Sequence, residues 1–138
     1  MNYHNATQRY KEIDTFSGTA YADPHQLIQM LMQGVIDKVS IAKAAMQEDN
    51  VAVKGENISK TISILDGLKA SLDKEKGGDI AQNLDDLYDY MQRALVDGNL
   101  NNDMKKLDEV ISLMVEIKDA WGAIPVDVRE EHAKVAVS

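Results

Sequence analysis

Apolar residues recur at helical spacing in four stretches of the chain, and residues that start or stop helices separate these stretches. The spacing predicts helices over about 24–48, 51–73, 79–98 and 102–121. Connections this short place consecutive helices side by side and antiparallel. We therefore expect an all-α fold, an antiparallel up-down-up-down four-helix bundle that occupies residues 23–122.

The residues at the predicted helix ends have physical reasons to be there. Asp23 can cap the first helix, with Pro24 at its first position, where a missing N–H costs nothing. Gly78 closes a Lys-Gly-Gly turn, after which Asp79 is expected to cap the third helix. Gly98, followed by an asparagine, predicts the end of that helix.

Both ends of the chain lie outside the predicted bundle. Residues 1–22 form an arm with too few aliphatic side chains to fold alone. Its four aromatic residues are Tyr3, Tyr10, Phe16 and Tyr21. Residues 123–138 form a short loose tail, because Pro125 and a run of charges interrupt any regular pattern.

The apolar arc of each predicted helix is wider than the roughly 100° that a bundle needs to hide. Such a surplus indicates either a binding groove or a surface covered by the terminal segments, and both can hold at once. An arm with aromatic side chains could cover a groove until a partner helix displaces it. The candidate partner-contacting residues are Ile28, Met32, Ile64, Leu68, Tyr90 and Leu113, with Tyr10 in the covering arm.

Composition narrows the range of partners. The formal net charge of −8 argues against nucleic acid and anionic membrane surfaces as partners. The chain has no cysteine, which suits the reducing cytoplasm. Residues 1–22 carry no apolar run like that of a signal peptide, and charges interrupt every apolar cluster. We therefore expect a cytoplasmic protein without membrane insertion.

The residue types that usually build catalytic sites in helical bundles are not found in the required spacing. Neither the Glu-x-x-His pairs of di-iron proteins nor the His-Glu-x-x-His zinc helix occurs. His4, His25 and His132 are far apart in the sequence. We therefore predict no enzyme activity, no metal and no cofactor.

Three motifs resemble the flagellar export chaperone FliS family. They are the Ala-Asp-Pro-His-Gln-Leu-Ile stretch over 22–28, Ser-Leu-Asp-Lys-Glu-Lys-Gly-Gly over 71–78, and Asn-Leu through Leu-Tyr-Asp-Tyr-Met over 83–91. The resemblance extends from about Tyr10 to Trp121, nearly the whole chain.

The resemblance implies a cytosolic chaperone that binds the C-terminal segment of newly made flagellin in a one-to-one complex. It also implies protection from premature polymerisation, delivery to the flagellar type III export apparatus, and an arm in which Tyr10 takes the place of the family's tyrosine. The chain departs from the family pattern at Tyr21, Asp23 and Ala94. The alternative is a regulatory adaptor that sequesters another flagellar protein such as the anti-sigma factor, and a co-chaperone is a further possible partner.

Overall fold

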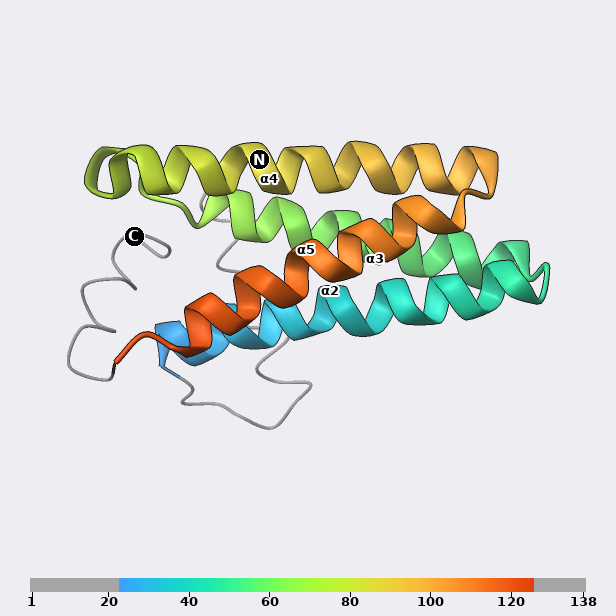
Figure 1. The fold of residues 1–138 in the computed structure, drawn as a ribbon, viewed down its shortest axis with the longest axis horizontal. Helices are drawn as coiled ribbons and strands as arrows, with labels where there is room; N and C mark the ends of the chain where they lie inside the picture. The colour runs from blue at the N-terminus through green and yellow to red at the C-terminus, as the bar shows by residue number, and fades with distance from the viewer. Residues whose placement is uncertain (1–22, 126–138) are drawn as a thin grey trace.

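The computed structural model describes residues 23–125, in which short turns join four helices and no strand occurs. In chain order its helices are α2 (Pro24–Gln47), α3 (Val51–Ala70), α4 (Lys74–Asn101) and α5 (Met104–Gly122), as Figure 1 shows. The prediction of an all-α fold is confirmed. The predicted arm over residues 1–22, and the predicted tail from residue 126 onward, lie outside the described residues.

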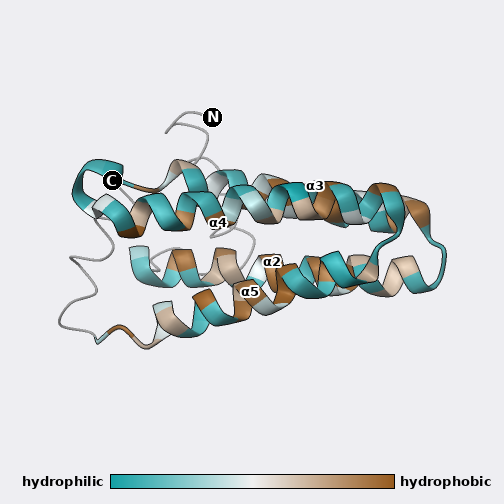
Figure 2. Cartoon of the chain, turned by 45° about the horizontal axis from the view of Figure 1, so that its top comes forward, coloured by the Kyte–Doolittle hydropathy of each residue, from teal (hydrophilic) through white to brown (hydrophobic). Residues whose placement is uncertain are grey.

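The helices form a closed ring of neighbours. Each packs against the next helix in the sequence, and α5 returns to pack against α2. In Figure 1, α4 runs along the top and α5 crosses in front. Figure 2 shows the α3–α4 pair above the α2–α5 pair, with apolar and polar residues alternating along the helices. In this up-down-up-down arrangement, each helix lies beside two neighbours.

Polar side chains cap the start of every described helix. The Asp23 carboxylate accepts a hydrogen bond from the backbone N–H of Gln26 at 2.7 Å, as predicted for the start of α2. Asn50, Asp73 and Asp103 accept backbone N–H groups in the same way at the starts of α3, α4 and α5. Each cap satisfies donors that have no partner inside the helix.

The start of α4 corrects one predicted boundary. Asp73 caps the helix through the N–H groups of Glu75 and Lys76, so α4 begins five residues before the predicted start at Asp79. Gly78, the fifth residue of α4, is not helical, with φ 51° and ψ −130°, so the predicted Lys-Gly-Gly turn is present as a kink between a first short turn of helix and the longer part that follows from Asp79. Glycine adopts such a conformation without the steric cost that a Cβ would bring.

The C-terminal end of α4 corrects another. The helix continues through Gly98 to Asn101, and Asn102 ends it in the left-handed region at φ 50°. Gly98 is buried against α5, where an added Cβ would lie 2.7 Å from Cδ1 of Leu107. The missing side chain therefore serves the close approach of two helices rather than the end of one. The third boundary that differs is that of α3, which ends at Ala70 and not near residue 73.

The bundle core is formed by apolar side chains from all four helices. Its largest fully buried members include Ile28, Leu31, Met32, Leu65, Leu68, Tyr88, Met91, Leu95, Leu107 and Met114. Burial raises the pKa of the Tyr88 phenol, because the phenolate would lose its hydration. At one end of the bundle, the rings of His25 and Trp121 stack with their centroids 4.7 Å apart and join α2 to α5.

Candidate functional site

A shallow groove of about 480 Å³ runs between the outer faces of α3 and α4. Ile62 contributes its α3 side, while Val96 and Leu100 stand one helical turn apart on its α4 side. Val96 is 47% exposed and Leu100 is 75% exposed. Together they form a small exposed apolar patch within a groove, which makes this surface a candidate binding site. We refer to these three residues as the apolar strip of the α3–α4 groove.

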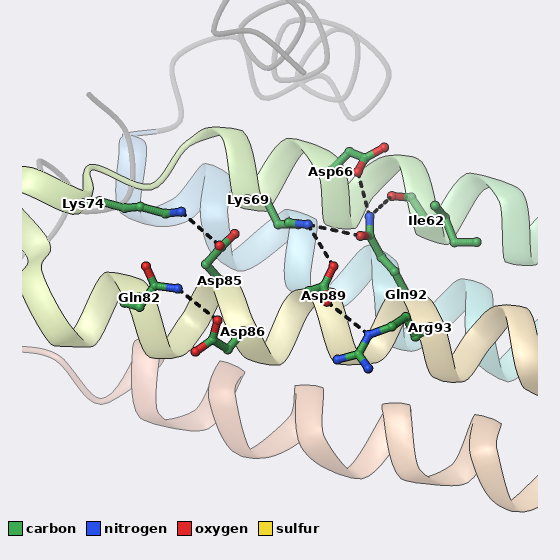
Figure 3. A network of polar contacts seen from close by, with 10 residues as sticks. All are labelled: Ile62, Asp66, Lys69, Lys74, Gln82, Asp85, Asp86, Asp89, Gln92 and Arg93. Carbon is green, nitrogen blue, oxygen red and sulfur yellow. Dashed lines mark hydrogen bonds and ion pairs between the residues drawn. The ribbon is translucent and has the colours of Figure 1, made fainter.

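Gln92 fixes the width of the groove beside the apolar strip. Its side-chain amide donates to the backbone oxygen of Ile62 at 3.1 Å and to the carboxylate of Asp66 at 2.7 Å (Figure 3). These two bonds tie α4 to both the backbone and a side chain of α3. The groove walls are therefore held in place by polar contacts as well as by packing.

An ion-pair cluster continues the groove toward the N-terminal half of α4. The Asp89 carboxylate lies 3.4 Å from Nζ of Lys69 and 3.1 Å from Nε of Arg93, as Figure 3 shows. The hydrogen bond from Lys69, aided by both positive charges, lowers the pKa of Asp89. Farther along, Lys74 and Asp85 pair at 3.0 Å. The charged side chains of this cluster are thus paired with one another.

A buried lysine secures the opposite end of the groove. Lys54 of α3 is 5% exposed, and its ammonium donates to the backbone oxygen of Asn99 at 3.1 Å and to the side-chain oxygen of Asn102 at 2.6 Å. A cation at a helix C-terminus is favoured by the partial negative charge of the last carbonyl groups. Lys54 thereby anchors the turn of α4 that carries Leu100.

Three of the residues predicted to contact a partner lie in the core. Ile28, Met32 and Leu68 are each at most 2% exposed, so their predicted position on the outer flank of the bundle is wrong. In α2, Ile28 and Met32 share helical spacing with Val35, which is fully buried. They therefore lie near the centre of the buried face, and α3 and α5 cover the wide apolar arc of α2 from both sides.

The remaining predicted contact residues are partly buried and lie on different sides of the bundle. Ile64 reaches α2, where its Cδ1 would lie 3.3 Å from a Cβ added to Gly34. Tyr90 faces α5 and donates its hydroxyl to Glu109, and Leu113 lies one turn along α5 from that carboxylate. The hydrogen bond to Glu109 raises the pKa of Tyr90. The structure thus brings Tyr90 and Leu113 to one side and Ile64 to another, and Tyr10 lies outside the described residues.

The apolar strip contains two residues that sequence analysis missed. Val96 and Leu100 are four residues apart and fall outside the stripe of α4 that includes Met91 and Leu95. A signal for them does exist in the sequence. Two large aliphatic residues at i and i+4 that lie off the buried stripe mark an exposed apolar position on a helix. The charged Asp97 between them supports this interpretation.

Other kinds of site find no support in the described part of the chain. Residues 23–125 contain no group of three or more His, Cys, Asp or Glu side chains arranged to hold a metal ion. Their helices include no stretch long and apolar enough to cross a membrane. His25 is occupied in the contact between α2 and α5.

A helical bundle with an exposed apolar strip between two rigidly joined helices is typical of proteins that bind another polypeptide. A sequence model of the family described as "Flagellar protein FliS" matches residues 3–127 of the chain. The chain therefore belongs to the FliS family of flagellar secretion chaperones.

Curated relatives agree with this assignment. The "Flagellar secretion chaperone FliS" of Vibrio cholerae is 46% identical over 118 residues, which cover 86% of this chain and 87% of the relative. "Flagellar secretion chaperone FliSB" of Pseudomonas aeruginosa is 42% identical over 119 residues, with 86% and 94% covered. The FliS protein of Bacillus subtilis is 30% identical over 118 residues, with 85% and 87% covered. The resemblance found in the sequence motifs is thereby confirmed.

Proposed function

We propose that this protein is a cytosolic chaperone that binds the C-terminal segment of flagellin in a one-to-one complex. Binding keeps the segment from polymerising before export, and the complex is delivered to the flagellar type III export apparatus. Membership of the FliS family gives the class of substrate. The observation that carries the proposal is the exposure of Val96 and Leu100 beside Ile62 in a groove whose walls are fixed.

The physical logic of the proposal is the covering of an apolar face. A segment that assembles a filament is amphipathic, and while unassembled it exposes the face that later packs against other subunits. The apolar strip of the α3–α4 groove offers that face a surface of matching character. Tyr90 and Leu113, on the side of the groove that faces α5, are proposed as secondary contacts for a segment that continues around the helix.

The arm over residues 1–22 is proposed to compete with the substrate for the apolar surface. The substrate can bind only those molecules whose apolar surface the arm leaves free. The arm therefore lowers the apparent affinity for the substrate in proportion to the fraction of such molecules. Replacing Tyr10 with Ala should therefore tighten binding of the flagellin segment. Unchanged or weaker binding would remove Tyr10 from the covering role.

Assembly of purified flagellin tests the proposal, since protection from polymerisation is the activity itself. Light scattering follows filament growth with and without the full-length chain. We expect growth to fall in proportion to the added chain and to stop near equimolar concentrations. Filament growth that is unaffected by an excess of the chain would rule out the proposed activity.

A variant with Tyr90 and Leu113 both replaced by Ser tests the secondary contacts. We expect weaker protection with the far-ultraviolet dichroism of a helical protein retained. A matched control is Glu116→Gln, an exposed substitution on α5. Protection equal to that of the unaltered chain would remove Tyr90 and Leu113 from the contact surface.

A further inference from the structure

The carboxylates that line the α3–α4 groove differ in how their charges are balanced. Asp89 is paired with the cations of Lys69 and Arg93. Asp66 and Asp97 accept hydrogen bonds from neutral amides, that of Gln92 at 2.7 Å and that of Asn101 at 2.7 Å. Within residues 23–125, neither of these two carboxylates has an ion-pair partner.

The two unbalanced carboxylates line the groove together with the apolar strip. Asp66 comes from the α3 wall and Asp97 from the α4 wall, next in sequence to Val96. Among the lining residues, Asp89 is balanced by Lys69 and Arg93, which leaves the charges of Asp66 and Asp97 uncompensated. The exposed part of the groove therefore combines aliphatic surface with uncompensated negative charge.

We propose that the groove selects an amphipathic helix of the export substrate that carries Lys or Arg beside its apolar face. Aliphatic residues at i and i+3 or i+4 of that helix pack on the apolar strip. The flanking cations pair with Asp66 and Asp97. This inference rests on the proposed function for the identity of the substrate, and it adds the charge pattern that the substrate must have.

The negative charge of Asp66 and Asp97 also argues against other occupants of the groove. A second copy of the chain, with its formal net charge of −8, would bring acidic surfaces together. An apolar helix flanked by Glu would meet Asp66 and Asp97 with like charge. A helix flanked by Lys or Arg would instead form favourable ion pairs with both carboxylates, and the hydrogen bonds from Gln92 and Asn101 would stay in place.

Two synthetic helical peptides test the charge pattern on the full-length chain. They share the same leucine positions over about 18 residues, or about five turns, and differ in carrying Lys or Glu beside the leucines. Calorimetry measures both peptides, and the C-terminal segment of the cognate flagellin, at about 50 mM and about 300 mM salt. We expect the Lys peptide to bind about tenfold more tightly than the Glu peptide at low salt, and the difference to shrink at high salt.

Variants of the chain locate the effect. The double substitution Asp66→Asn and Asp97→Asn should lower affinity for the Lys peptide by about three- to tenfold and abolish the preference over the Glu peptide. The double substitution Val96→Ser and Leu100→Ser should weaken both peptides. The control Asp119→Asn removes one exposed carboxylate of α5 and should leave the preference intact. Urea unfolding checks that each variant remains folded.

The outcomes separate this inference from the proposed function. Flagellin binding that is insensitive to all four groove substitutions would overturn the inference and leave the proposed function standing. Equal affinity of the chain for the Lys and Glu peptides would also overturn it. Absence of flagellin binding to the unaltered chain would overturn the proposed function, and the flagellar occupant with it, whatever the peptides do.

Discussion

The rings of His25 and Trp121 stack, and each side chain donates a hydrogen bond to the backbone oxygen of the other residue. The indole N–H of Trp121 donates to the backbone oxygen of His25 at 2.9 Å. Nε2 of His25 lies 2.7 Å from the backbone oxygen of Trp121 and must carry the proton, because a carbonyl can only accept. The rings stack within 9° of parallel. This reciprocal contact joins the first turn of α2 to the last turn of α5.

Removing the imidazole should therefore destabilise the bundle. In His25→Ala, the oxygen of Trp121 loses its shorter hydrogen bond and keeps only the one from the N–H of Ile124 at 3.3 Å, and the indole loses its stacking partner. We expect a loss of about 2 kcal/mol or more in the free energy of unfolding. Urea unfolding followed by the fluorescence of Trp121, the only tryptophan of the chain, measures it. The exposed substitution Gln26→Ala in the same turn is the control, with an expected change within about 0.5 kcal/mol. Similar values for the two variants would contradict this account.

Two glycines inside helices should respond to alanine with opposite sign. In Gly98→Ala the new methyl would lie 2.7 Å from Leu107 and 3.1 Å from Lys106, so we expect destabilisation by about 1–3 kcal/mol. In Gly55→Ala nothing lies within 4 Å of the new methyl, and the better helix propensity of alanine should stabilise the protein by about 0.5–1 kcal/mol. Thermal unfolding of both variants gives the comparison. A stabilised Gly98→Ala variant would show that α4 and α5 are not in close contact there.

Lys54 should matter far more to stability than a surface lysine of the same helix. Lys54→Ala leaves the oxygens of Asn99 and Asn102 without their donor, for an expected cost of about 2 kcal/mol. Lys60→Ala removes an exposed ion pair with Glu56 that water and salt screen, so it should change the free energy of unfolding little. Urea midpoints of the two variants measure the difference, and equal midpoints would mean that Lys54 does not anchor the end of α4.

Tyr90 should ionise above the ordinary phenol pKa of 10.0, because its neutral hydroxyl donates to the Glu109 carboxylate. The stabilisation from this bond is complete below pH 10 and is lost as the pH rises through the raised pKa of Tyr90. Absorbance titration at alkaline pH, taken as the difference between the unaltered chain and Tyr90→Phe, isolates this residue. Glu109→Gln should move its midpoint downward and Glu116→Gln should not. An unmoved midpoint in Glu109→Gln would contradict the assigned cause.

Much of the fold could be predicted from the sequence, wherever a local residue pattern is compatible with a single structural feature. Asp23 followed by Pro24 is a helix start in any context, and α2 begins there. Gly98 is compatible with two structural roles, the end of a helix or the close approach of another helix. The contact with Leu107 decides between them, and it joins residues of different helices. At the start of α4, Asp73 caps a first short turn, and Gly78 breaks the helical geometry before the longer part that begins at Asp79.

The candidate site was less predictable, because exposure depends on how far neighbouring helices cover an apolar arc. A helical wheel gives the width of the arc of α2 but not the positions of α3 and α5, which bury Ile28 and Met32. The spacing of Val96 and Leu100 marks them as an exposed pair in the sequence, but their place in a groove depends on α3 lying beside them. The surplus of apolar surface was predicted, and its location required the packing of the helices.

Calorimetric titration of the C-terminal segment of the cognate flagellin into the full-length chain tests the central claim most directly. Heat of binding reports complex formation without relying on export or filament growth. We predict saturable binding at micromolar concentrations with one segment per chain. Absence of saturable heat at these concentrations, with a folded chain verified by its helical dichroism, would contradict the claim that this bundle holds flagellin.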